Sequence, residues 1–143
     1  MKRDYPERPL VGIGVVIWRG EKALLVKRAK PPRAGQWSLP GGAQELVETV
    51  FAAARREAFE ETGLRITVTG LVDVVDAIER DEAGRVRHHY TLIDVAAEAA
   101  PGEARAGSDA AAIRWVSLDD IAALELWDET ARVIRLAARK RRA

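Results

Sequence analysis

Cysteine is absent from this chain of 143 residues. Its absence excludes disulfides, thiol nucleophiles and cysteine-based zinc sites, and a reducing compartment is compatible with it. Long apolar runs are absent too, because the longest, Val11 to Trp18, contains two glycines and is far too short to span a bilayer. The first ten residues are charged and contain proline, unlike a secretion signal. We therefore expect a soluble cytoplasmic protein with no membrane partner.

Neither sign of charge dominates, since 23 basic side chains are balanced by 22 acidic ones and the formal net charge is +1. This balance gives no bulk electrostatic reason to expect nucleic acid as the main partner. The basic run Arg139 to Arg142 is most simply a tail suited to the C-terminal end of a helix. The length is typical of one domain with its own core, so we expect residues 1–143 to form a single domain.

Segments rich in Val and Ile alternate with turn signals along the chain, and helical segments lie among them. Strands are predicted at 10–19, 23–28, 37–40, 64–78 (one long strand or a pair), 85–97 and 113–116. Loops are predicted at 29–36, as one wall of a pocket, and at 99–110, as a mobile segment. Helices are predicted at 47–61, after a capping box at 117–120, and from 128 through 136. This order predicts an α+β protein, or a three-layer α/β/α arrangement around a mixed sheet.

The most informative stretch runs from Gly41 to Leu64. A glycine pair after Pro40 predicts a loop, the absence of Gly and Pro from 47–61 predicts a helix, and Gly63 predicts its end. One apolar strip of this helix is expected to face the core, and it consists of Val47, Val50, Phe51, Ala54 and Ala58.

Three carboxylates share a neighbouring strip of the same helix. Glu60 and Glu61 lie about 60° and 40° to either side of Glu57. Like charges this close repel each other, so we expect a cation between them. Arg55 and Arg56 are predicted to project away from the middle of the strip, which favours a divalent metal ion. Oxygen ligands of this kind suit magnesium or manganese, and the alternative is a solvated acidic helix face.

The spacing of particular residues extends well beyond the carboxylates. In order, these positions are Gly42, Glu48, Arg56, Glu57, Glu60, Glu61 and Gly63. The pattern resembles the Nudix box of the Nudix hydrolase superfamily, and the run from Trp37 to Gly42 resembles the segment that leads into it. Ala58 alone is smaller than the residue usual at its position. The resemblance covers nearly the whole chain and implies the Nudix-like three-layer fold.

The resemblance also implies roles for individual residues. Glu60 and Glu61 match metal ligands for Mg²⁺, with Mn²⁺ as the other candidate, and a carbonyl of Gly41 or Gly42 is implied as a further ligand. Glu57 matches a residue that binds metal or activates water. Arg56 would orient a box glutamate by an ion pair, and Glu48 would be a supporting or metal-linked carboxylate. Family members often use one more acid from beyond the box, for which the candidates are Glu98, Glu103 and Asp109.

The implied reaction is water attack on a pyrophosphate in a nucleoside diphosphate linked to another group, such as ADP-ribose or another nucleotide sugar. No proline lies between Pro40 and Pro101, and the first tyrosine after the box is Tyr90, so two subgroup markers are absent from their usual places. Pyrophosphohydrolysis of nucleoside triphosphates is therefore the nearest alternative. Others are a non-catalytic nucleotide sensor and an RNA-end pyrophosphohydrolase. A homodimer is a family-level expectation.

Two further features are interpreted as structural. His88 and His89 are adjacent on a strand and would point to opposite faces, which argues against a shared metal site. The aromatic residues are more often core than platforms for a nucleobase. They are Trp18, Trp37, Trp115, Trp127 and Tyr90.

Overall fold

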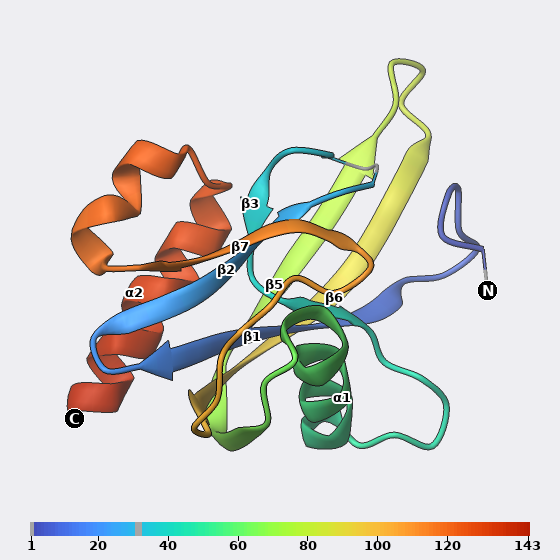
Figure 1. The fold of residues 1–143 in the computed structure, drawn as a ribbon. Helices are drawn as coiled ribbons and strands as arrows, with labels where there is room; N and C mark the ends of the chain where they lie inside the picture. Colours follow the sequence, from blue (N-terminus) through green and yellow to red (C-terminus); the bar gives the residue numbers. More distant parts are fainter. Residues whose placement is uncertain (1, 31–32) are drawn as a thin grey trace.

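The computed structural model describes residues 2–30 and 33–143. Its strands form one mixed sheet (Figure 1). They are β1 (Leu10–Arg19), β2 (Lys22–Arg28), β3 (Trp37–Ser38), β4 (Gly41–Ala43), β5 (Ile66–Arg80), β6 (Val86–Ala99) and β7 (Ala110–Val116). The strand order is β3-β2-β1-β6-β5, with β4 paired to β1 and β7 paired to β2. β1 and β6 run parallel, and the other pairs are antiparallel.

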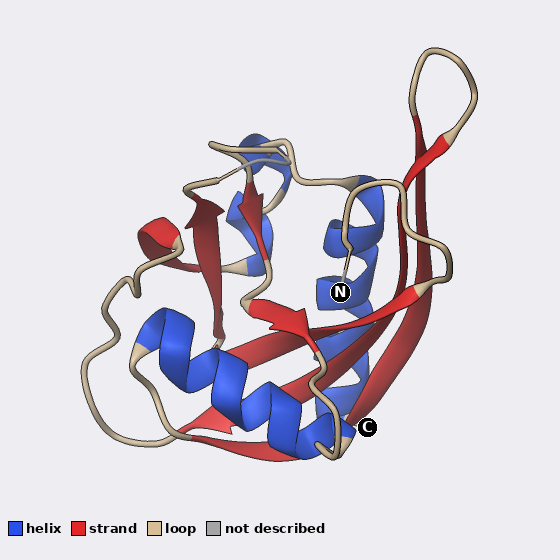
Figure 2. Cartoon of the chain, turned by 90° about the vertical axis from the view of Figure 1, so that its right-hand side faces the viewer, coloured by secondary structure: helices blue, strands red, loops and turns tan. Residues whose placement is uncertain are grey.

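Two helices cover opposite faces of this sheet (Figure 2). They are α1 (Val50–Thr62) and α2 (Asp128–Arg142), and two short 3₁₀ helices, η1 (Leu118–Asp120) and η2 (Ala122–Leu124), precede α2. Because side chains alternate along β1, Val16 and Trp18 pack in the core on the α2 side, while Val15 and Ile17 pack on the α1 side. The predicted three-layer α/β/α arrangement is thereby confirmed.

Helix α1 begins three residues later than predicted. Thr49 is its N-cap, and the Thr49 hydroxyl accepts a hydrogen bond from the N–H of Ala52 at 3.1 Å. Val47, expected inside the helix, lies in the preceding loop with φ of 73°. The predicted end is confirmed, since Gly63 adopts φ of 72° and its N–H bonds to the carbonyl of Phe59.

The predicted apolar strip of α1 is only partly correct. Ala54 and Ala58 are fully buried, but Val47 is 94% exposed and Phe51 is 40% exposed. Alanines at the centre of the interface let the helix lie close to the sheet, so Ala53 is buried too and the bulkier residues lie at its margin.

Other boundaries differ from the predictions. The glycine pair expected in a loop forms β4. Of the two forms predicted for 64–78, the single long strand is confirmed, and it spans 66–80. The expected capping box is wrong, because the Ser117 hydroxyl bonds to the Asp120 carboxylate and not to backbone. The last helix continues to Arg142, so the basic run is helical. Among the described helices, none has the length and apolar character needed to cross a membrane.

Candidate active site

The glycine pair of β4 lies against the acidic face of α1. The N–H of Gly41 donates to Oε2 of Glu61 at 3.1 Å. Beside it, a Cβ on Gly42 would lie 2.5 Å from the carboxyl carbon of Glu57, and one on Gly41 would collide with the carbonyl of Ile13. Both positions therefore need glycine for close approach, and β4 holds two helix carboxylates at its backbone.

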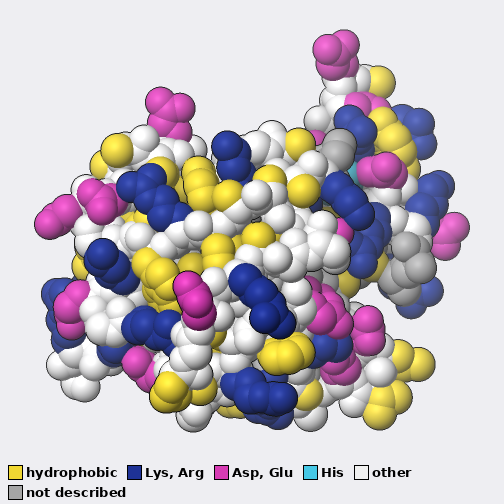
Figure 3. Space-filling view, in the orientation of Figure 1, with side chains coloured by type: hydrophobic (Ala, Val, Ile, Leu, Met, Phe, Trp, Pro, Cys, Tyr) yellow, Lys and Arg dark blue, Asp and Glu magenta, His cyan; other side chains and the backbone are white. Residues whose placement is uncertain are grey.

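Arg56 connects the loop before α1 to the helix. Its Nε and Nη2 donate to the two oxygens of Glu48 at 2.7 and 2.8 Å, and Nη2 also donates to the carbonyl of Ala43 at 3.0 Å. Its Nη1 donates to Glu57 at 2.7 Å and to Glu60 at 3.3 Å. The prediction that Arg56 projects away from the carboxylates is wrong, because its guanidinium contacts Glu57 and Glu60 on the helix as well as Glu48 in the preceding loop. Figure 3 shows acidic and basic side chains intermixed over this part of the molecule.

The acidic side chains differ in their electrostatic surroundings. The Arg56 guanidinium lowers the pKa of Glu48 to about 2, helped by the N–H of Glu45. Burial raises the pKa of Glu57, although Arg56 opposes the change. Burial also raises the pKa of Glu61 to about 7, against the effect of the Gly41 N–H. Both Glu57 and Glu61 are therefore harder to ionise than a carboxyl in water, because burial disfavours the charged form.

The donor set fits a hard divalent cation. Two half-buried to buried carboxylates with raised pKa values lie beside backbone carbonyls of β4, and the side chain of Glu60, 58% exposed, lies at the margin. Within residues 2–30 and 33–143, no group of three or more His, Cys, Asp or Glu is already arranged to hold a metal ion. Part of the reason is visible in Arg56, which occupies oxygens of Glu57 and Glu60.

A pocket of about 580 Å³ opens at the same glycine pair. Gly41 and Gly42 form part of its lining, and the rest comes from β1, the end of β2, the segments on both sides of β3, β3 itself, β5, β6, the start of α2 and the N-terminal segment. Trp37 and Trp127 contribute aromatic surface, and the guanidinium of Arg33 lies 5.2 Å from the Trp127 ring. The volume is within the usual range for a small-molecule site. A ligand in this pocket would therefore reach the backbone that holds Glu57 and Glu61.

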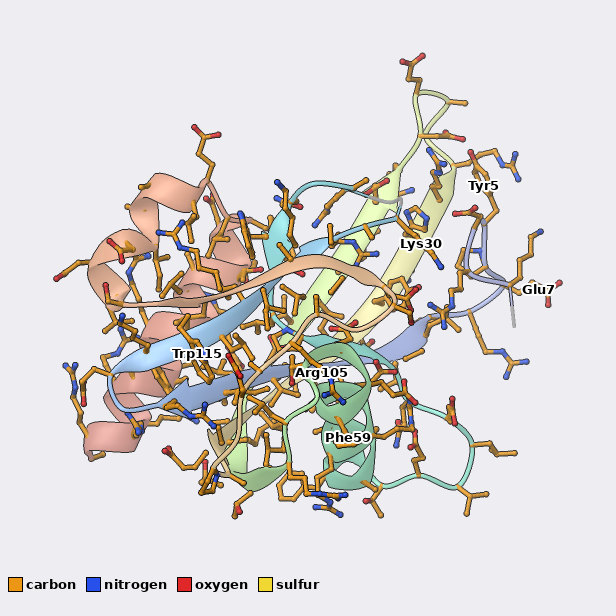
Figure 4. All side chains as sticks on the ribbon, in the orientation of Figure 1. Tyr5, Glu7, Lys30, Phe59, Arg105 and Trp115 are labelled. Atoms are coloured by element: carbon orange, nitrogen blue, oxygen red, sulfur yellow. The ribbon has the colours of Figure 1, made fainter. Side chains whose placement is uncertain are left out.

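The N-terminal segment also reaches this pocket. Arg3 and Asp4 line it, and Oδ1 of Asp4 lies 2.6 Å from Nε2 of His88. Nδ1 of His88 lies 3.3 Å from Glu79, so the histidine is held between two carboxylates. The Tyr5 hydroxyl donates to Asp81 at 2.8 Å, beside the β5–β6 hairpin (Figure 4). His88 therefore bridges two carboxylates and also lines the pocket, whereas His89 is not part of the lining.

The three additional acids predicted from beyond the box are separated from one another. Both oxygens of Glu98 accept from Arg141 at 2.9 Å, and Glu98 pairs with Trp18, near the end of β1 and beyond the part of β1 that pairs with β4. Glu103 is exposed in the 100–109 loop. Asp109 lies close enough to Glu61 for its charge to raise the pKa of Glu61, although burial and Glu57 have larger effects. The same loop packs against α1 near Arg105, whose N–H bonds to Thr62 (Figure 4).

Several pocket residues were missed by sequence reasoning. Asp94 on β6 is 6% exposed and lines the pocket, and Arg33 lines it too. Arg28 was not missed, because its positive charge at the end of a predicted strand made it a candidate phosphate contact, and it lines the pocket as well. Trp37, Trp127 and Tyr90, interpreted as core, also line it. The mixed polarity of 85–97 is a sequence feature that could have indicated a polar cavity beside this strand. The predicted pocket wall at 29–36 includes Pro31 and Pro32, which lie outside the described residues.

Comparison with known proteins shows which class of protein this chain resembles. A family model described as the NUDIX domain matches residues 8–137. An ADP-ribose pyrophosphatase of Methanocaldococcus jannaschii is 37% identical over 125 residues, covering 84% of this chain and 72% of the relative. A putative 8-oxo-dGTP diphosphatase of Mycobacterium tuberculosis is 40% identical over 67 residues, 46% of this chain and 47% of the relative. The chain thus spans only about half of that second relative.

A solved structure supports the same class. The MutT Nudix hydrolase of Burkholderia pseudomallei superposes with a TM-score of 0.79 at 35% identity, covering 91% of this chain and 98% of that one. Fold and acidic site together define a hydrolase of pyrophosphate bonds. The chain belongs to the Nudix family.

Proposed function

We propose that this chain hydrolyses a pyrophosphate bond in a nucleoside diphosphate linked to another group, with ADP-ribose or another nucleotide sugar as substrate and Mg²⁺ as cofactor. The observation that carries the proposal is the shared glycine pair, because Gly41 and Gly42 line the pocket while Glu61 and Glu57 lie against them. The Methanocaldococcus relative named as an ADP-ribose pyrophosphatase supports this substrate class.

The metal site is proposed at Glu57, Glu60 and Glu61 with a backbone carbonyl of Gly41 or Gly42. A bound divalent ion would neutralise substrate phosphate charge and polarise the phosphorus centre. Arg28 and Arg33 at the pocket rim would bind phosphate oxygens, since guanidinium groups match their geometry.

Arg56 and Glu48 are proposed as positioning residues. Arg56 holds Glu57 through Nη1 and is itself held by the two oxygens of Glu48. We assign the general base to Glu57 rather than Asp109. Burial raises the pKa of Glu57, whereas Asp109 is ion-paired with Lys30 at 3.0 Å and its side chain is 62% exposed. In this assignment Glu57 takes a proton from the attacking water while the water oxygen bonds to phosphorus. The bridging P–O bond of the pyrophosphate breaks, and a nucleotide and a phosphorylated fragment are released.

Nucleoside triphosphates are the second candidate substrate class. The Mycobacterium tuberculosis relative named as a putative 8-oxo-dGTP diphosphatase and the absent proline after the box favour it. A non-catalytic sensor is less favoured because the acidic residues of the box are all present. A homodimer, a cytoplasmic location and a single domain over 1–143 stay predictions.

The experiment is a hydrolysis panel of ADP-ribose, other nucleotide sugars, dinucleoside polyphosphates and intact and oxidised nucleoside triphosphates, with Mg²⁺ or with EDTA. Glu60→Gln should abolish most metal-dependent turnover while keeping the fold, because its side chain is largely exposed. Glu82→Gln, at the exposed β5–β6 turn, is the matched control and should keep full activity. Wild-type rates in folded Glu60→Gln would remove Glu60 from the mechanism, and no cleavage of any substrate would favour the sensor.

A further inference from the structure

One buried carboxyl in the pocket has no partner. Asp94 is 6% exposed, lies on β6 between β1 and β5 and lines the pocket, yet its side chain has no hydrogen bond or ion pair with any described residue. The nearest charges belong to Asp73, Arg132 and Glu129, and they act on it only through space. A buried acceptor without a donor destabilises a fold, and an apolar residue of similar size would avoid that penalty.

The backbone next to Asp94 provides room for its carboxyl. Gly14 on β1 pairs with Asp94 on β6, and a Cβ at position 14 would collide with Oδ1 of Asp94. The carboxyl therefore lies over the bare backbone of β1, on the α2 side of the sheet. Leu39 from the β3–β4 segment bounds the same space, since its Cδ1 would be 3.4 Å from that Cβ.

The other acids in the pocket are already engaged or exposed. Glu79 and Asp4 both lie against His88, and Glu129 pairs with Arg132 at 2.7 Å. Asp76 is exposed. Asp94 is therefore the buried acid of this pocket whose oxygens are available to a ligand.

The surroundings of Asp94 suit a flat, mostly apolar ring. Leu92 and Val75 provide aliphatic surface beside it, and Trp37, Tyr90 and Trp127 provide aromatic surface. In such a pocket a few polar groups fix the orientation and identity of the ligand. An ionised carboxylate only accepts hydrogen bonds, so it selects for N–H donors at the edge of the ring.

We propose that Asp94 is a specificity-determining residue that accepts hydrogen bonds from the amino-bearing edge of a nucleobase seated in this pocket. The inference rests on the proposed function in that a nucleotide is the ligand. It adds the feature of the base that is recognised and the residue that recognises it. A base without an amino group would leave the carboxylate buried and unpaired, which is the basis of discrimination.

The test measures binding without turnover. Binding of nucleoside monophosphates in EDTA at pH 7.5 is followed by the fluorescence of the tryptophans in the pocket, Trp37 and Trp127. Two ligand pairs differ by a single amino group: guanosine against inosine monophosphate, and adenosine against purine riboside monophosphate. Wild type should bind the amino-bearing member of at least one pair about tenfold or more tightly than its partner, as for one hydrogen bond to a charged group.

Two variants at position 94 test whether Asp94 causes the difference in affinity between the members of each pair. Asp94→Leu removes both acceptors and should bind the two members of each pair equally. Asp94→Asn keeps the size of the side chain and one acceptor, so the difference in affinity within each ligand pair should shrink to a few-fold. This variant provides the test if Asp94→Leu does not fold. Asp119→Asn alters an exposed carboxyl on η1 outside the pocket and should bind like wild type.

The outcomes separate this inference from the proposed hydrolysis. Loss of discrimination in the Asp94 variants supports the inference even if the hydrolysis panel is negative. Three results would overturn the inference even if the hydrolysis panel is positive. In the first, the wild type binds none of these nucleotides, and in the second it binds both members of each pair equally. The third such result is that folded Asp94→Leu and Asp94→Asn distinguish the pairs as well as the wild type does.

Discussion

Arg56 binds Glu48 through two parallel hydrogen bonds of 2.7 and 2.8 Å, joining helix α1 to the loop that precedes it. The same guanidinium reaches Glu57 and the carbonyl of Ala43. One planar side chain thus fixes the loop, the end of β4 and a carboxylate of the candidate site. Lysine carries the same charge but cannot reproduce this fork.

Arg56→Lys should reduce turnover by about tenfold or more, because Glu57 loses a positioned donor, and should lower the free energy of unfolding by about 1 kcal/mol. The measurement is kcat and KM on the substrate found by the panel, with thermal unfolding alongside. Arg55→Lys is the matched control, since Arg55 is exposed beside it. An unchanged kcat in Arg56→Lys would show that the fork does not position Glu57.

Gly42→Ala tests the close approach of β4 to α1. The added Cβ would lie 2.5 Å from the Glu57 carboxyl, so Glu57 must move and turnover should fall by about tenfold or more. Gly70→Ala on β5 is the control, because its Cβ would have no neighbour within 4 Å. Equal activity of the two variants at equal folded fraction would count against the placement of Glu57 at Gly42.

The stability of the protein should depend on the ionisation of Asp94. Burial raises the pKa of Asp94 to about 6, a change opposed by Arg132 and reinforced by Asp73 and Glu129. The folded state therefore binds more protons than the unfolded state between about pH 4 and pH 6, and this group makes stability fall as pH rises through that window.

Asp94→Asn should remove this dependence and raise the free energy of unfolding above pH 6 by about 2 kcal/mol. Urea unfolding at pH 4.5, 6 and 7.5 measures the difference between the two proteins, and Asp119→Asn controls for the loss of a surface charge. A difference that does not grow with pH would show that Asp94 is not destabilised by burial.

Val47 adopts φ of 73° although it is β-branched, and it is 94% exposed. Val47→Gly should relieve backbone strain without loss of packing and raise stability by about 1 kcal/mol. The midpoint of thermal unfolding measures this effect. Leu46→Gly, 95% exposed and without positive φ, should give no gain. If both variants are equally destabilised, the strain at position 47 is not significant.

The acidic helix and its surroundings were predictable without knowledge of the fold. Local signals were sufficient there: the helical spacing placed Glu57, Glu60 and Glu61 on one strip, and Gly63 ended the helix as predicted. The strands with clear apolar runs, such as 10–19, were also predicted correctly. These features depend on residues near one another in the chain, so composition and periodicity carry the information.

The set of residues that share the pocket, in contrast, depends on how the strands and helices pack together. Asp94 lies beside Gly14 because β1 and β6 pair in parallel across eighty residues of chain, and no local pattern encodes that register. The direction of Arg56 depended on the path of the loop that brings Glu48 back to the helix. The exposure of Phe51 depended on how closely its alanine neighbours let α1 approach the sheet. Long-range pairing and packing set these outcomes because they depend on partners distant in sequence.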